Sequence, residues 1–214
     1  MREARASRVA ALPEASVARR RPAQQRSRDR LERILVAASQ LMAQKGSDQV
    51  KMSEVAELAE ISIGSLYQYF PDKQAITRML AERHAAENHR CIEAALAGVR
   101  DLDALLAAFS SLVDQYHRIV RTEPVMRDIW SAMQADKQLM ALELADSKAS
   151  GALLAAAMRR VHPKTRHKNI DTVAFLVWQL GEATMRLAIS HNRTEGARLV
   201  DAYKRMTLRA IAEP

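Results

Sequence analysis

Cysteine is nearly absent from this sequence, in which Cys91 is the single one among 214 residues. One thiol cannot form an internal disulfide, so a disulfide-stapled scaffold is excluded and a reducing compartment, the cytoplasm, is expected. We expect Cys91 to be a small, buried or half-buried residue on a helix. The histidines do not occur in a zinc-binding spacing such as H-E-x-x-H, and a glycine-rich phosphate loop is missing. Neither a metal site nor a cofactor is predicted.

Long apolar runs are also missing. The most apolar stretch, residues 173–180, is far shorter than the roughly 20 residues that a membrane-spanning helix needs, so no membrane partner is expected. Residues 1–26 lack the apolar segment of a secretory signal. They are rich in arginine but contain Glu3 and Glu14, which favours a disordered basic arm over a mitochondrial presequence.

Glycine and proline number only six each, whereas alanine, leucine, methionine, glutamate and arginine are plentiful. This composition favours helix and predicts an all-α fold of about nine helices. The length suits one large domain or a small domain joined to a larger one.

Positive charge is concentrated at the N-terminus. Residues 1–33 hold ten arginines and four acidic residues, a net charge of +6 out of +8 for the whole chain. Such a distribution is expected of a segment that faces a polyanion. A solvated tail without a partner is the alternative.

Apolar residues at helical spacing predict the first helices. The first predicted helix runs from about residue 27 to Lys45 and ends at Gly46; its apolar positions are Leu31, Ile34, Leu35, Ala38, Leu41 and Met42. A short helix over about 52–59 follows, and then a break of a few residues. Ser62 can cap the next short helix, which ends at Phe70-Pro71, and Asp72 can cap a fourth that reaches about residue 99. Later helices are predicted at about 101–121, 124–134, 136–161, 168–190 and 195–212.

The third helix, Ser62-Ile63-Gly64-Ser65-Leu66-Tyr67-Gln68-Tyr69-Phe70, has two contrasting faces. At 100° per residue, Ile63, Leu66 and Phe70 share one face, which we expect to be buried. The other face carries Gly64, Ser65 and Gln68 between two tyrosines. Glycine costs a helix about 1 kcal/mol relative to alanine, and close approach of another surface is one reason to keep it. A glutamine can bond an adenine edge, and serine and tyrosine hydroxyls can bond phosphates, so this face suits a DNA duplex.

Lys73 lies in the first turn of the fourth helix, where the helix dipole disfavours a cation. A phosphate at that helix end would accept both the lysine and the free amide groups. Two short helices joined by a tight turn, with the polar face on the second, form a helix-turn-helix.

The segment from Val55 to Lys73 resembles the DNA-binding segment of the tetracycline-repressor (TetR) family. The resemblance rests on a tyrosine, a second aromatic residue, Phe, a short spacer and Lys that follow the turn, and it is strong over about 30–77. It implies a helix-turn-helix domain (27–73) after the disordered arm (1–26), and a helical ligand-binding and dimerisation domain (74–214). It also implies that Ser62, Ile63, Gly64, Ser65 and Gln68 meet the major groove, whereas Tyr67, Tyr69 and Lys73 hold phosphates.

Two residues depart from the family pattern. Glu60 occupies the turn position where the family usually has glycine, which predicts a strained or rearranged turn with an acid near the DNA. Lys51 replaces the usual Thr or Ser cap of the first motif helix, so a capping oxygen is lost but another phosphate contact is possible.

The resemblance further implies a homodimer and a ligand pocket. Apolar faces on the last two helices need a cover, which either the chain's own core or a second copy can supply. The resemblance implies a second copy, and the interface candidates are Leu176, Leu180, Leu187, Leu199, Tyr203 and Met206. Methionines and a few aromatic residues in 100–190 suit either an adaptable pocket or ordinary core. The pocket candidates are Phe109, Tyr116, Trp130, Met133 and Trp178.

The sequence therefore predicts a DNA-binding transcriptional repressor and not an enzyme. A homodimer would place two recognition helices on a near-palindromic operator, and a small apolar or amphipathic inducer would release it. The alternatives are a helical-bundle enzyme or binding protein that retains the motif without using it, and a constitutive or activating regulator. Ser110, Asp114 and His117 lie on neighbouring turns but are better interpreted as surface or pocket residues than as a catalytic set.

Overall fold

The computed structural model describes residues 15–123, 125–135 and 137–214, with side chains described except at 15–23, 132–135 and 165–167. Within these ranges all regular structure is helical, so the all-α prediction is confirmed. The elements are α1 (Ala15–Lys45), η1 (Ser47–Gln49), α2 (Met52–Leu58), α3 (Ile63–Tyr69), α4 (Lys73–Ala97), α5 (Leu102–Thr122), α6 (Val125–Ala135), α7 (Lys137–Val161), η2 (Lys164–Asn169), α8 (Ile170–Ser190) and α9 (Arg193–Ala212). The short 3-10 helices η1 and η2 were not predicted.

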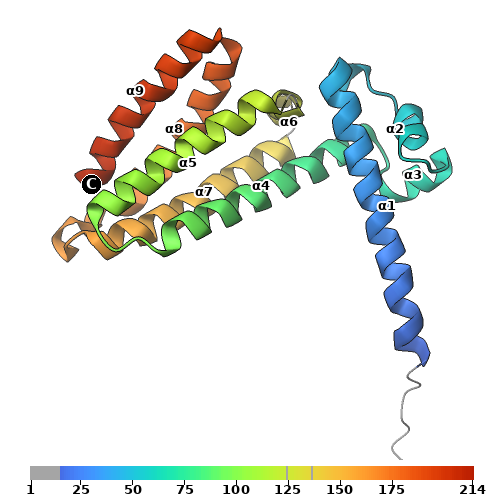
Figure 1. Ribbon diagram of the computed structural model, residues 1–214, viewed down its shortest axis with the longest axis horizontal. Coiled ribbons are helices and arrows are strands. Elements are labelled where there is room, and N and C mark those ends of the chain that lie inside the picture. The colour runs from blue at the N-terminus through green and yellow to red at the C-terminus, as the bar shows by residue number, and fades with distance from the viewer. Residues whose placement is uncertain (1–14, 124, 136) are drawn as a thin grey trace, which may run out of the picture.

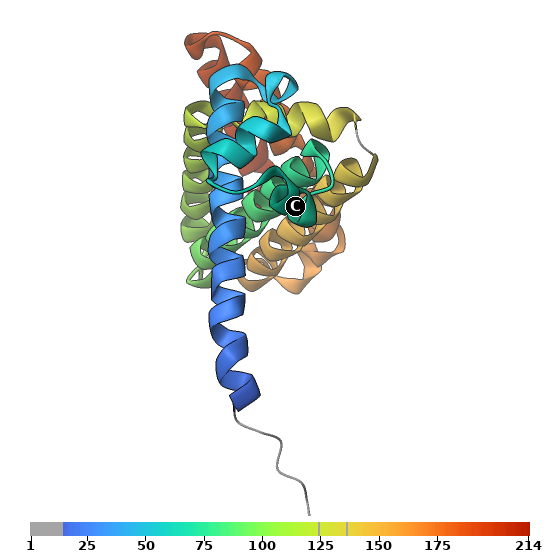
Figure 2. The same cartoon turned by 90° about the vertical axis from the view of Figure 1, so that its right-hand side faces the viewer.

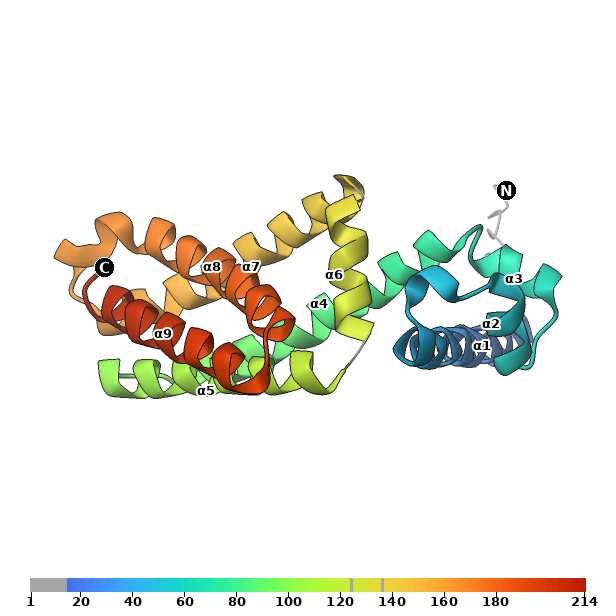
Figure 3. The ribbon, with the colours of Figure 1, turned by 90° about the horizontal axis from the view of Figure 1, so that it is seen from above.

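Helices α1 to α3 form a small unit at one end of the molecule, and α5 to α9 form a larger bundle at the other (Figure 1). Helix α4 starts beside α2 and α3 and runs into the bundle (Figure 3), where it packs against α5, α6 and α7. Its buried side chains extend from Ile76 near the start to Leu96 near the end, so one continuous apolar core joins the two parts.

Helix α1 begins earlier than predicted. The prediction of a disordered arm over 1–26 is wrong for residues 15–26, which are helical, and residues 1–14 lie outside the described chain. Alanine, arginine and glutamine favour helix strongly, and these turns continue a helix that Ile34 and Leu35 already anchor in the core. They project beyond the rest of the molecule (Figure 2). Pro22 costs about 3 kcal/mol inside a helix, so we expect these turns to be the least stable part of α1.

Capping residues fix where the helices start. The Ser62 side chain accepts a hydrogen bond from the Ser65 N–H at 3.2 Å, and Asp72 Oδ1 accepts one from the Ala75 N–H at 2.7 Å. Both predicted caps are confirmed. Such bonds satisfy amide groups that have no partner within the helix, so they define the ends of the turn that leads into α3 and of the one that leads into α4.

Two residues adopt left-handed backbone conformations at the ends of helices. Gly46, with φ of 81°, follows α1 as predicted for a terminating glycine. Glu60, with φ of 55°, lies in the turn between α2 and α3. The strain predicted for this turn is confirmed, because a residue with a Cβ atom pays about 1–2 kcal/mol in that conformation.

Candidate functional site

The outward face of α3 is the first candidate site. Tyr67 is 52% exposed, and Gly64 and Gln68 are exposed beside it, whereas Leu66 and Phe70 are buried against the core. Ile63 departs from the prediction of a buried face, because it is 43% exposed. Side chains on a helix lean toward its N-terminus, so the side chain of the first residue projects past the helix end.

Gly64 lies in open space. A Cβ atom built at this position meets no described atom within 4 Å. No contact within the described protein therefore requires a glycine on this face, although glycine weakens the helix.

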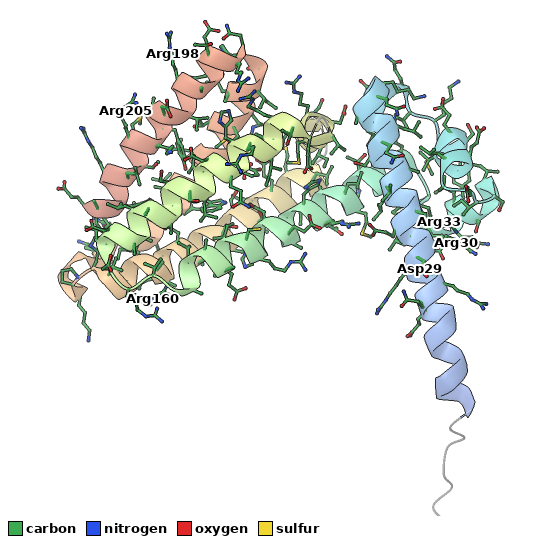
Figure 4. All side chains as sticks on the ribbon, in the orientation of Figure 1. Asp29, Arg30, Arg33, Arg160, Arg198 and Arg205 are labelled. Carbon is green, nitrogen blue, oxygen red and sulfur yellow. The ribbon has the colours of Figure 1, made fainter. Side chains whose placement is uncertain are left out.

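Two residues of α1 contact α3, and sequence reasoning missed them. Ser27 Oγ lies 3.0 Å from the hydroxyl of Tyr69, and Arg30 Nη1 donates to Ser65 Oγ at 3.4 Å. Figure 4 shows Arg30 on α1 next to the α3 region. Ser27 and Arg30 lie on the same helix face as the buried Ile34, at seven and four positions before it, and this spacing is the signal that could have found them. Their hydrogen bonds hold the side chains of Ser65 and Tyr69 in position from the α1 side.

Lys73 has partners within the chain. Its Nζ donates to the carbonyl oxygens of Ser47 at 2.5 Å and Asp48 at 3.2 Å. These bonds connect the start of α4 to η1. They account for a lysine in the first turn of α4, so no bound phosphate is needed to explain its position. An ammonium group has three donors, so one remains for a phosphate.

Lys51 precedes α2 with an exposed side chain. Lys51 supplies no capping oxygen to the first turn of α2. Glu54 instead accepts from the Lys51 N–H at 2.9 Å and from Lys45 Nζ at 2.6 Å. The Lys45 hydrogen bond, followed by the Lys51 N–H, lowers the pKa of Glu54. Glu54 therefore stays ionised at the positive end of α2, where a carboxylate is stabilising.

A cavity of about 180 Å³ lies inside the larger bundle, lined by residues of α4 to α8. Tyr116 and Trp130, both pocket candidates, line it. Phe109 and Trp178 line a second cavity of about 40 Å³, which shares Tyr116 with the first. The side chain of Met133 lies outside the described residues. Cys91 lines the larger cavity but is exposed, so the expectation that it is buried or half-buried is wrong.

Glu182 is a charged residue buried at the junction of the two cavities. It is 8% exposed, and its Oε2 accepts a hydrogen bond from the Tyr116 hydroxyl at 3.1 Å. Burial raises its pKa from 4.5 to about 7, and the negative charges of Glu143 and Asp146 add to the increase, whereas the Tyr116 hydrogen bond and Arg186 oppose it. Sequence reasoning missed Glu182, since a glutamate within an apolar helix gives no sign of which way it faces.

Helices α8 and α9 present an uncovered apolar face. Leu176, Leu180 and Leu187 on α8 and Met206 on α9 are each about half exposed or more, and Leu199 is half-buried. Tyr203 was predicted on this face, but that prediction is wrong. It is buried within the chain, where its hydroxyl donates to the Val177 carbonyl at 2.7 Å. Its ring lies beside Gly181, whose missing side chain leaves room for it.

Other kinds of site find little support among the described residues. Asp114 forms an ion pair with Lys204 Nζ at 2.7 Å on the surface, which argues against a catalytic set with His117. The described side chains include no group of three His, Cys, Asp or Glu residues that could hold a metal ion. None of the described helices has both the length and the apolar character to cross a membrane.

Comparison with known proteins agrees with this geometry. Residues 34–79 match the family described as "Bacterial regulatory proteins, tetR family", and residues 103–214 match "Tetracyclin repressor-like, C-terminal domain". The repressor NemR of Escherichia coli (strain K12) is 33% identical over 90 residues, which are 41% of this chain and 45% of NemR. The match thus spans less than half of the length of NemR. The repressor KstR of Mycolicibacterium smegmatis is 25% identical over 198 residues, 87% of this chain and 91% of KstR.

Solved structures share the fold. A TetR-family transcriptional regulator from Streptomyces coelicolor superposes with a TM-score of 0.67 at 20% identity, covering 87% of this chain and 97% of that chain. RolR in complex with resorcinol superposes with a TM-score of 0.57 at 20% identity, over 90% of this chain and 97% of RolR.

The fold, the exposed helix-turn-helix and these matches define a DNA-binding transcriptional regulator. The match over 103–214 alone covers more than half of the chain. The chain belongs to the TetR family.

Proposed function

We propose that this protein is a repressor that binds a near-palindromic operator as a homodimer and leaves it when a small molecule fills the larger cavity. The observation that carries the proposal is that α6 contacts both sites. Trp130 on α6 lines the cavity, and Asp128, half a turn away, accepts a hydrogen bond from the Ser47 N–H in η1 at 2.9 Å. Lys73 joins the same η1 turn to α4. A shift of α6 would thus reach the DNA-binding unit directly.

The face of α3 supplies the contacts with DNA in this proposal. Ser62, Ile63, Gly64 and Gln68 meet base edges in the major groove, and the open space at Gly64 lets the duplex approach the helix backbone. Tyr67, Tyr69, Lys51 and Lys73 hold phosphates on either side of the groove. Ser27 fixes the position of Tyr69, so α1 helps to set the distance between the phosphate-binding side chains on the two sides of the groove.

The uncovered apolar face of α8 and α9 pairs with its copy. A two-fold dimer of this kind places two recognition helices in successive major grooves, about 34 Å apart. The proposed inducer prefers the dimer in which this spacing is wrong. A shift from mostly bound to mostly released requires a differential affinity of about 5 kcal/mol. RolR carries resorcinol in its solved structure, and a small phenol is therefore a reasonable first compound to screen against this cavity.

Selection of duplexes from a random pool by the full-length protein at about 0.15 M salt tests the DNA-binding part. We expect a near-palindrome with half-sites about one helical turn apart. Gln68→Ala should relax one base position in each half-site and cost about 1–3 kcal/mol, whereas Tyr67→Ala should weaken all sequences alike.

The matched control is Gln74→Ala, which removes an exposed amide on the first turn of α4. It should leave the selected sequence unchanged. Recovery of no preferred sequence, or the same base preference in the Gln68 variant and the wild type, would overturn the assignment of α3 as the reading helix.

A further inference from the structure

The larger cavity has an unusual charge. Five of the described residues that line it are carboxylic acids, namely Glu87, Glu123, Glu143, Asp146 and Glu182, and none is lysine or arginine. The chain as a whole carries a net charge of +8. The wall of this cavity is therefore acidic although the protein is basic, and an acidic wall is the charge complement of a cation.

Two of these carboxylates form no ion pair among the described residues. Glu143 pairs with Arg186 at 2.5 Å, Glu87 with Arg83 at 3.4 Å, and Glu123 with His84 at 3.7 Å. Glu182 accepts a hydrogen bond from the Tyr116 hydroxyl and has the charge of Arg186 nearby, and Asp146 has His89 nearby. Burial raises the pKa of the Asp146 carboxyl, so the empty cavity disfavours its charge. Burial is costly for a carboxylate that has no close ion pair, and a bound cation would offset that cost.

A neutral polar group lies in the same wall. Ser147 is 1% exposed and lines the cavity next to Asp146. Its hydroxyl oxygen can accept a hydrogen bond from a ligand in the cavity. The remaining wall is apolar and includes the side chains of Trp130 and Met126.

We propose that the cavity binds a small organic amine in its protonated form, with the ammonium group between Glu182, Asp146 and Ser147 and an apolar body against Trp130. This inference rests on the proposed function, since it names the chemical class of the effector. An ammonium group has donors for both carboxylates and the hydroxyl, and indole and methionine side chains contact a ring or a cation well. The cavity is smaller than the roughly 300–1,000 Å³ typical for drug-sized molecules, so a compound with a single ring fits best.

Three compounds with the same body and different head groups test the proposal: 4-phenylbutylamine, 4-phenylbutanol and 4-phenylbutanoate. Each is titrated into the full-length protein at pH 7.5 by calorimetry. We expect the amine to bind at least about tenfold more tightly than the alcohol, and the carboxylate not to bind, because repulsion by the wall excludes it. Glu182→Gln and Asp146→Asn should each remove most of the advantage of the amine without changing the affinity for the alcohol.

Glu93→Gln is the matched control, because Glu93 is an exposed carboxylate on α4 that does not line the cavity. It should leave all three affinities unchanged. Equal binding of amine and alcohol, or no binding of the amine, would overturn the proposal. The comparison of head groups on the wild-type protein decides the matter even if a cavity variant fails to fold.

The failure of this proposal and that of the proposed function have different signatures. If the alcohol or a neutral phenol binds more tightly than the amine and weakens operator binding, the effector class is wrong but the repressor function holds. If the amine binds with the expected selectivity and operator affinity does not change, the effector class holds and control of DNA binding by this cavity fails.

Discussion

Glu60 lowers the local stability of the DNA-binding unit through its backbone conformation. It is exposed, its backbone is left-handed with φ of 55°, and it lies between the two helices of the motif. Only glycine adopts this conformation without steric cost, so the glutamate is kept against local stability. Its carboxylate also lies at the end of the molecule that would approach DNA.

Glu60→Gly should stabilise the protein by about 1 kcal/mol, since relief of the left-handed strain exceeds the entropy that glycine adds to the unfolded chain. Denaturation by urea measures this change. The control is Glu57→Gly, which places glycine inside α2 and should destabilise by about the same amount. A loss of stability in the Glu60 variant would show that its side chain contributes more than the backbone costs.

Gly64→Ala should have opposite effects on stability and on DNA binding. The free protein gains about 1 kcal/mol, because alanine favours helix and meets nothing. Operator affinity falls by about tenfold if the duplex approaches the α3 backbone, since a methyl group then overlaps the DNA. Gly98→Ala is the control, because Gly98 also lies in open space but follows α4 at the far end from α3. Unchanged operator affinity in the Gly64 variant would mean that DNA does not approach this face closely.

Glu182 should make stability depend on pH. Its pKa is about 7 in the folded protein and 4.5 ordinarily, so between these values the folded state binds more protons than the unfolded state. Stability therefore falls as pH rises from about 4.5 to about 7 and changes no further above that range. The full effect is at most about 3 kcal/mol. Glu182→Gln should remove this dependence and make the protein more stable than wild type at pH 8, as thermal unfolding at pH 5 and pH 8 will show. A wild-type stability that does not fall between these two values would contradict the account.

The helices α8 and α9 form an element pair whose outer face has no cover in a single chain. Leu180 is 50% exposed and Met206 is 68% exposed. Close packing of the pair itself depends on glycine: a Cβ atom on Gly196 of α9 would lie 2.3 Å from the Ala188 carbonyl oxygen of α8, which leaves no room for a side chain there. The bundle is thus compact on its inner side and open on its outer side.

Leu180→Glu should convert the proposed dimer to monomer. Each copy loses the burial of a leucine, about 1.5–3 kcal/mol, so the dissociation constant rises by more than about 100-fold. Sedimentation at micromolar concentrations measures this. Leu144→Glu serves as the control, because Leu144 is 43% exposed on α7 and lies outside the α8–α9 face. Dissociation by both variants, or by neither, would place the interface elsewhere.

The whole molecule consists of the α1–α3 unit and the larger bundle, joined by α4 and α6. The sequence predicts the helices of both better than the contacts between distant segments. The helices were predictable because apolar spacing and caps such as Ser62 and Asp72 act locally. The start of α1 was not, because residues 15–26 show no sustained apolar spacing and include Pro22, both of which argue against helix in the sequence alone. The bonds of Lys73 to η1 and the burial of Glu182 and Tyr203 depend on packing between distant segments, which spacing along one helix cannot reveal.

The central claim is that a dimer places two α3 helices in successive major grooves, and methylation protection of guanines on the selected operator tests it most directly. We predict two protected blocks in the major groove, on one face of the duplex, with centres about one helical turn apart. Both blocks should be lost together in Leu180→Glu. A single block, protection confined to the minor groove, or an unchanged pattern in the Leu180 variant would contradict the account.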